Sequence, residues 1–123
     1  MTTEEFIRRI NVAVYDTSVN GTLSLLEKPP GRRPSETLVA LSQWFNQLSP
    51  YDKERVNDAI QLSVWETVFG MLAVLDGVRS IREAGEEAGS FELRYNTQGQ
   101  SYLLNKSTGE FLHDIFSAQV PPL

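Results

Sequence analysis

Residues 49–77 decide the fold and read SPYDKERVNDAIQLSVWETVFGMLAVLDG. Ser49 is a favourable helix N-cap, and Pro50 has the backbone conformation that the first helical position needs. Asp52 places negative charge where the helix dipole is positive. Apolar residues then recur at helical spacing as far as Leu75. The stretch therefore predicts a long helix that begins at Pro50 and reaches at least Leu75.

The C-terminal end of this helix has two interpretations. The helix stops near Leu75, or it continues past Asp76-Gly77 to residue 84, where two later glycines would end it. In the second case Arg79 and Glu83 would form an ion pair one turn apart, as would Arg82 and Glu86.

Most of the circumference of the long helix is apolar. Large side chains form one face and widen it almost all the way round: Ile60, Leu62, Val64, Trp65, Val68, Phe69, Met71, Leu72, Leu75 and Val78. A helix of this kind belongs in the centre of a domain. The remaining stripe contains small residues and one carboxylate: Ala59, Ser63, Glu66, Gly70, Ala73 and Gly77.

This stripe also has two interpretations. Small side chains let another helix or a second subunit approach closely, which would offset the cost of about 1 kcal/mol that Gly70 carries inside a helix. Alternatively, the stripe is the floor of a mostly apolar pocket, in which Glu66 would be shielded from water and act as a general acid or base. We favour packing, because a single carboxylate without a partner does not by itself indicate catalysis.

Two shorter helices are predicted before the long one. Apolar residues spaced by three and four predict a helix over residues 3–15, and Asn20-Gly21 is expected to end it or to turn the chain. Residues 27–34 contain three prolines and a glycine and are predicted to form an exposed loop. Ser35 then opens a second helix to about residue 48, whose predicted core face consists of Leu38, Leu41, Trp44, Phe45 and Leu48.

A change of period after Gly89 predicts β-structure. Phe91, Leu93 and Tyr95 alternate with polar residues, as in a half-buried strand, and residues 101–105 form the returning strand. Residues 96–99 suit a three-residue hairpin loop that ends on a left-handed glycine. The alternation predicts that Tyr95 faces inward, near Tyr102 across the hairpin.

The chain after residue 105 has two interpretations. Residues 110–112 form a short third strand, or Ser107 and Glu110 form the capping box of a short helix. We favour a meander that passes into a helix near His113, followed by a loose tail over residues 119–123.

Together these elements predict an α+β fold in a single domain, residues 1–123. Three to four helices, with the long third helix central, precede a small antiparallel β-hairpin or meander and a short C-terminal helix. An isolated hairpin is barely stable, so it must pack on the helices.

The composition excludes several classes of function. The chain has no Cys and one His, which excludes thiolate zinc sites, cysteine nucleophiles and multi-histidine metal sites. With 11 basic and 16 acidic residues its net charge is −5, which argues against nucleic acid as a partner. No apolar stretch approaches the about 20 residues of a membrane span. We therefore expect a cytoplasmic protein without cofactor, metal, nucleic acid or membrane.

Two functional hypotheses follow. The first is a small acidic protein-binding module without enzymatic activity, such as an inhibitor, an immunity-like protein or an adaptor. Residues 61–123 hold 4 basic and 8 acidic residues, a net of −4, and would meet a basic partner through Glu83, Glu86, Glu87 and Glu92.

The second hypothesis is a small-ligand-binding or catalytic domain, with Glu66 and His113 as weak catalytic candidates. His113 and Asp114 are adjacent and do not face one another on a helix or strand, so a partner for the imidazole would come from elsewhere, such as Glu110 or Ser117. A homodimer is compatible with both hypotheses.

Overall fold

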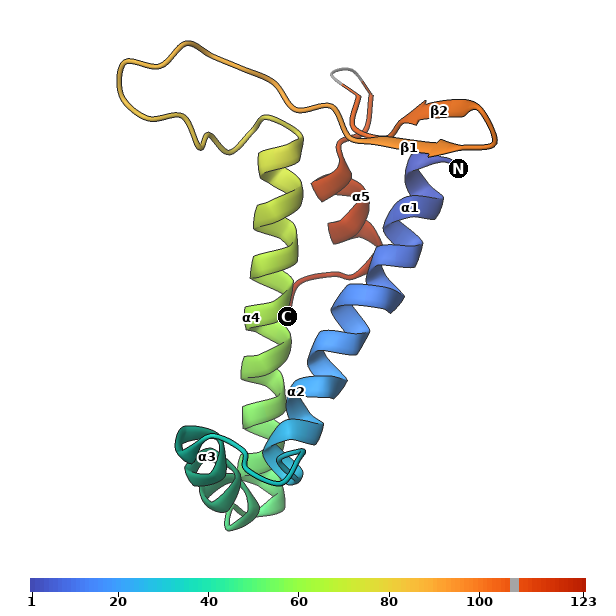
Figure 1. Ribbon diagram of the computed structural model, residues 1–123. Helices are drawn as coiled ribbons and strands as arrows, with labels where there is room; N and C mark the ends of the chain where they lie inside the picture. The colour runs from blue at the N-terminus through green and yellow to red at the C-terminus, as the bar shows by residue number, and fades with distance from the viewer. Residues whose placement is uncertain (107–108) are drawn as a thin grey trace.

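The computed structural model describes residues 1–106 and 109–123, which form two long helices, two short helices and a β-hairpin (Figure 1). In chain order the elements are α1 Thr3–Ile10, the π-helical segment η1 Asn11–Asp16, α2 Thr17–Glu27, α3 Glu36–Asn46, α4 Pro50–Leu75, β1 Arg94–Thr97, β2 Gln100–Leu103 and α5 Leu112–Gln119. The α+β architecture predicted from the sequence is confirmed, with its long third helix, its antiparallel hairpin and its short C-terminal helix.

The first long helix runs without a break through α1, η1 and α2, so the prediction that Asn20-Gly21 ends it is wrong. The chain stays helical because this stretch buries Val19 and Leu26. Burying two aliphatic side chains stabilises the fold by about 1.5–3 kcal/mol each, which outweighs the about 1 kcal/mol that Gly21 costs inside a helix. Thr2 caps the start of this helix in a reciprocal capping box with Glu5.

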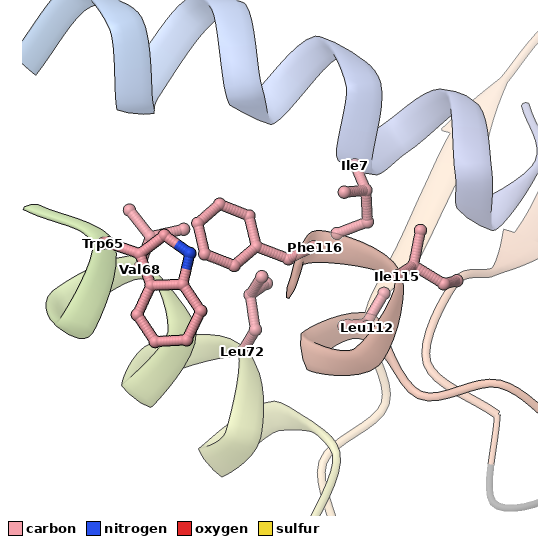
Figure 2. Packing of buried hydrophobic residues seen from close by; sticks show 7 residues of the cluster. All are labelled: Ile7, Trp65, Val68, Leu72, Leu112, Ile115 and Phe116. Atoms are coloured by element: carbon pink, nitrogen blue, oxygen red, sulfur yellow. The ribbon is translucent and has the colours of Figure 1, made fainter. Parts of the chain in front are cut away.

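The two long helices converge at the α3 end of the molecule and diverge toward the hairpin, where α5 lies between them (Figure 1). The main core fills this wider end (Figure 2). Its buried residues come from α1, α4 and α5: Ile7, Trp65, Val68, Leu72, Leu112, Ile115 and Phe116. Phe116, Ile7 and Leu112 are the largest side chains that are completely buried. The short C-terminal helix therefore packs between the two long helices and joins them through its buried side chains.

Aromatic contacts surround Phe116 in this core. Trp65 lies 5.7 Å from Phe116 between ring centroids, and Tyr15 meets Phe116 edge-on at 6.2 Å. Burial, and to a lesser degree the charge of Asp16, raises the pKa of the Tyr15 phenol. The indole Nε1 of Trp65 donates to the carbonyl oxygen of Val120 at 2.6 Å, so the tail is tied to the core at that residue and exposed over 121–123.

Helices α3 and α4 begin as predicted. The Ser35 hydroxyl accepts from the Leu38 N–H at the start of α3, and the Ser49 hydroxyl accepts from the Asp52 N–H at the start of α4. The predicted core face of α3 is only half correct, since Phe45 is buried while Leu41 and Trp44 are 44% and 51% exposed. Helix α3 packs on α2, which covers only one of its sides.

Helix α4 ends at Leu75, and the longer alternative to residue 84 is wrong. Gly77 takes a left-handed φ of 79°, and the N–H groups of Gly77 and Val78 donate to the carbonyls of Val74 and Ala73. This is a Schellman end, which satisfies carbonyls that the helix leaves without partners. Residues 78–92 form no helix, so the ion pairs expected between Arg79 and Glu83 and between Arg82 and Glu86 are not formed there.

One side of α4 is left open along most of its length. Of its 26 residues, five are buried: Trp65, Val68, Gly70, Leu72 and Ala73. Among the helices of the described residues, α4 is the one that is long and apolar enough to cross a membrane, a property that the core helices of soluble proteins share. The prediction of a central helix thus holds for one face only, because the chain has too few other elements to surround it.

The hairpin differs from its prediction at the turn. Thr97 pairs with Gln100, so the loop has two residues, Gln98 and Gly99, rather than three. Their φ angles of 50° and 73° correspond to a type I′ turn, which matches the twist of the strands. Tyr95 lies opposite Tyr102 as predicted, but it is 40% exposed rather than turned inward.

The chain between the hairpin and α5 forms no third strand over residues 110–112. Helix α5 begins at Leu112 with Phe111 as its N-cap, which confirms the helical alternative. The capping box predicted from Ser107 lies outside the described residues.

The turn gives a direct test of the hairpin. Gln98 is the one residue other than glycine with a positive φ in the described chain. Because asparagine adopts this conformation more readily, Gln98→Asn should raise the free energy of unfolding by about 0.5 kcal/mol, measured by urea titration. Gln98→Val, which is branched at Cβ, should lower it. A less stable Asn variant would contradict the left-handed turn.

Candidate functional site

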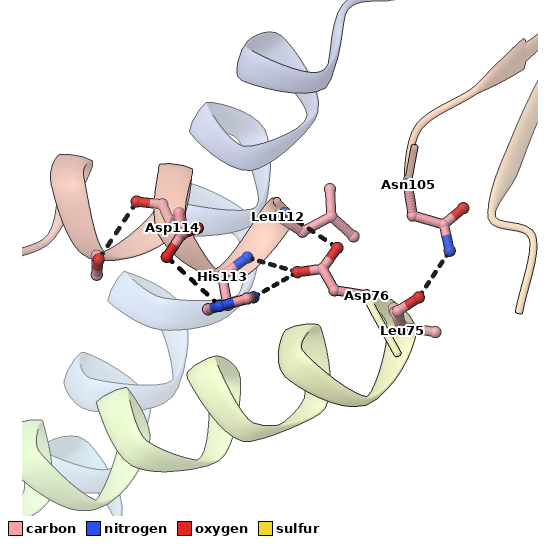
Figure 3. A network of polar contacts seen from close by, with 7 residues as sticks. Leu75, Asp76, Asn105, Leu112, His113 and Asp114 are labelled. Atoms are coloured by element: carbon pink, nitrogen blue, oxygen red, sulfur yellow. Dashed lines mark hydrogen bonds and ion pairs between the residues drawn. The ribbon is translucent and has the colours of Figure 1, made fainter. Parts of the chain in front are cut away.

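A network of buried polar contacts lies at the C-terminal end of α4 (Figure 3). The side chain of Asp76 is completely buried, and its carboxylate accepts from the backbone N–H groups of Leu112 at 3.1 Å and His113 at 2.9 Å. These are donors that the start of a helix leaves without partners. Asp76 therefore caps α5 from a position 36 residues earlier in the chain.

The same carboxylate also holds the imidazole of His113. Nδ1 of His113 lies 2.6 Å from Oδ2 of Asp76, and Nε2 lies 3.4 Å from Oδ1 of Asp114. The ring packs against the edge of Phe69 and stacks on Phe111, with centroids 5.2 and 5.5 Å away. The main partner of His113 is thus Asp76, and neither Glu110 nor Ser117, which the sequence offered as candidates. The expectation that the adjacent Asp114 would not face the imidazole is wrong, because its side chain folds back along the first turn of α5 to Nε2.

A His–Asp pair is also the orienting half of many general-base sites. Here both ring nitrogens face carboxylates, the side chain of His113 is 12% exposed, and Asp76 is occupied by the start of α5. The arrangement positions two helices relative to each other. Among residues 1–106 and 109–123, no three His, Cys, Asp or Glu side chains are arranged to hold a metal ion.

Asn105 is a buried residue that the sequence did not single out. Its Nδ2 donates to the carbonyls of Leu75 and Phe91, each at 2.8 Å, and its Oδ1 accepts from the N–H of Leu93 at 2.6 Å. One amide thus joins the last turn of α4 to the chain that enters the hairpin. Because these contacts lie 12 to 30 residues apart in the chain, no local pattern could have revealed them.

Glu66 lies on the open side of α4 and is exposed, as are Ala59 and Ser63 of the same stripe. The structure therefore does not provide the burial that a role for Glu66 as a general acid or base would need. Gly70 and Ala73 are buried, and Gly77 is the exposed residue of the Schellman end.

The residue that covers Gly70 is Arg79, from the turn after α4, and not another helix. The Cζ atom of its guanidinium lies 3.4 Å from the position that a Cβ atom at residue 70 would occupy. The glycine thus allows a close approach, as the packing interpretation required, but by a side chain of the same segment. Nothing in the sequence distinguishes this occupant from a helix.

Residues 77–92 leave the body of the molecule as one extended segment, which we call the arm (Figure 1). All sixteen of its residues are exposed, and none belongs to a helix or strand. It contains all four glutamates of the predicted binding surface: Glu83, Glu86, Glu87 and Glu92. The structure thus places them on one segment, although not on a helix.

Two open clefts lie at this end of the molecule. One, of about 520 Å³, lies between the last turn of α4 and the arm, and its lining includes Val74, Arg79, Ile81 and Phe91. The other, of about 810 Å³, lies between the start of α1 and the hairpin. Glu66 and His113 line neither of them.

Comparison with known proteins gives no match to a family model, to a curated protein or to a solved structure.

The Asp76 contacts predict a large difference between two carboxylates of the same region. Asp76→Ala leaves two N–H groups and an imidazole without their acceptor, so we expect the free energy of unfolding to fall by about 3 kcal/mol. Asp114→Ala, which removes a carboxylate that is 60% exposed, should change it by no more than about 0.5 kcal/mol. Urea titration followed by circular dichroism measures both. Equal losses would contradict the role of Asp76 as the cap of α5.

Proposed function

We propose that this protein is a non-enzymatic protein-binding module of the inhibitor, immunity-like or adaptor kind, and that the arm is its recognition element. The observation that carries this proposal is the run of sixteen consecutive exposed residues at 77–92 in a chain of 123. Segments of this length without secondary structure are uncommon in compact domains and are usually functional or act as linkers. The arm is no linker, since it returns to the same domain.

The arm carries large apolar side chains where a solvated loop would carry polar ones. Val78, Ile81 and Phe91 are 54%, 64% and 48% exposed. Contact with a partner would remove this surface from water, and each fully buried side chain of this size contributes about 1.5–3 kcal/mol. These three residues are the anchors of the proposed contact.

The charges of the arm favour a basic partner. It holds four glutamates against two arginines, Arg79 and Arg82, a net of −2. Glu92 pairs with Arg94 at 3.1 Å, and a carboxylate oxygen of Glu86 accepts from the N–H of Glu83 at 3.3 Å. Exposed charges of one sign raise the rate of association with a surface of the opposite sign, and salt weakens the effect.

The base of the arm is fixed, which lowers the entropy that binding must remove. Gly77 is held in the Schellman end of α4, and Asn105 fastens Leu75, Phe91 and Leu93 at the neck. The arm is thus a closed loop with its two ends side by side. A loop that is anchored at its neck samples fewer conformations before it binds.

Charge neutralisation on the arm tests the proposal. The full chain is immobilised, and captured proteins are quantified from lysate of the source cells at low and at physiological salt. We expect the variant with Glu83, Glu86, Glu87 and Glu92 all changed to Gln to lose at least about tenfold in recovery of the specific partner, and Ile81→Asp to lose as much because it removes an anchor.

The matched control removes the same charge elsewhere on the surface, at Glu27, Glu36, Glu54 and Glu110, all of which are exposed. Circular dichroism checks that every variant is folded. If the arm variants and the control recover the same partners in the same amounts, the arm is not the recognition element.

A further inference from the structure

A second open surface lies on α4, on the side that faces away from the core. Arg55, Ala59, Leu62 and Glu66 are exposed and follow one another at spacings of four, three and four residues, so they form one line along the helix. The line has a cation at one end, a carboxylate at the other and an uncharged middle. We propose that this face, which we call the α4 seam, binds the α4 seam of a second copy of the chain, with the two helices antiparallel.

Charge complementarity identifies the second copy as the occupant. With a two-fold axis between Ala59 and Leu62, the antiparallel arrangement places Arg55 of each copy beside Glu66 of the other, and Ala59 beside Leu62. The ion pair between Arg55 and Glu66 therefore forms twice, once on each side of the axis. In a parallel arrangement Arg55 would meet Arg55 and Glu66 would meet Glu66, which is repulsive. A two-fold interface requires a patch that is complementary to itself, and the α4 seam meets this condition.

A second pair of charges extends the match. The guanidinium of Arg79 lies over Gly70, beyond Glu66 on the same side of the helix. The same two-fold axis brings position 70 of one copy opposite position 51 of the other, next to Asp52. Arg79 would therefore face Asp52, an exposed carboxylate in the first turn of α4. Along this side of the molecule the charges alternate: Asp52 is negative, Arg55 positive, Glu66 negative and Arg79 positive. In the antiparallel copy the order is reversed, so each charge faces one of opposite sign.

The two charged residues of the seam are placed to make the contact. Arg55 is held by Asp58 at 2.9 Å and lies over the ring of Tyr51 at 4.9 Å, yet its side chain is 52% exposed. Its five N–H donors can serve a second carboxylate. Among the described residues, Glu66 has no cation within 4.0 Å. The second copy would provide that cation.

The chain exposes more surface than a compact monomer of its mass would. The chain exposes 8705 Å². A monomeric protein of 13.9 kDa is expected to expose about 6,700 Å². The difference, about 2,000 Å², includes the exposed arm as well as the open side of α4, and an interface of standard size removes about 800 Å² from each partner. At its centre the seam offers Leu62, which is 46% exposed, beside the small side chain of Ala59, which allows the helices to approach.

Charge reversal tests the α4 seam. Sedimentation equilibrium of the full chain, from about 1 to about 500 µM, should show a monomer–dimer equilibrium. Arg55→Glu and Glu66→Arg, each alone, bring like charges together twice and should raise the dissociation constant of the dimer at least about tenfold. The double variant Arg55→Glu/Glu66→Arg restores opposite charges and should return it to within about threefold of the original.

The matched controls are Arg33→Glu and Glu27→Arg, which make the same charge changes at exposed positions outside α4 and should leave the dimer unchanged. Circular dichroism checks the fold of each variant. A chain that remains monomeric over the whole range overturns the proposal, and so does a dimer that survives both single reversals or is not restored in the double variant. None of these changes touches the glutamates of the arm, so the result does not depend on the proposed function.

Discussion

The end of α4 at Asp76 is the constraint on which the rest of the structure depends. Two long helices that diverge leave a gap, and the gap is filled by α5, which carries the fully buried Leu112 and Phe116. A helix of eight residues is not stable alone, and its first N–H groups need acceptors. The buried carboxylate of Asp76 supplies them, and it holds the imidazole of His113 as well. The hydrophobic core therefore depends on a polar contact at its edge.

Asn105 extends this junction to the rest of the chain. Its amide ties the last carbonyl of α4 to the neck of the arm. The carbonyl of the preceding residue, Leu104, accepts from the Thr3 hydroxyl at the start of α1 at 3.1 Å. A two-stranded hairpin needs such support, because alone it is at best marginally stable. Three segments that are distant in sequence thus meet at one end of the molecule, while the α3 end is held by fewer buried residues.

The sequence predicted the elements whose signals are local. Ser35, Ser49 and Pro50 mark helix starts by the chemistry of one or two residues, and these starts are confirmed. Asn20-Gly21 was wrongly predicted to end the first helix, because the burial of Val19 and Leu26 outweighs the low helix propensity of glycine. The contacts of the candidate site could not be predicted, since Asp76 and Asn105 act across 12 to 37 residues and any polar side chain could have taken their places. For the same reason the sequence marked Gly70 as a point of close approach but could not name Arg79 as its occupant.

The way in which α4 ends also explains why the molecule has two open surfaces. The sequence from Val56 to Leu75 contains two charged residues, Asp58 and Glu66, so α4 has apolar surface to bury on more than one side. The left-handed Gly77 stops the helix and turns the following chain outward as the arm, instead of back across α4. What returns to the helix is the side chain of Arg79, which covers Gly70 and leaves Ala59, Leu62 and Glu66, on the same side of the helix, exposed. A single backbone turn thus creates the arm and leaves the α4 seam uncovered, and Arg79 is an arm residue whose side chain reaches back to α4 beyond the end of the seam.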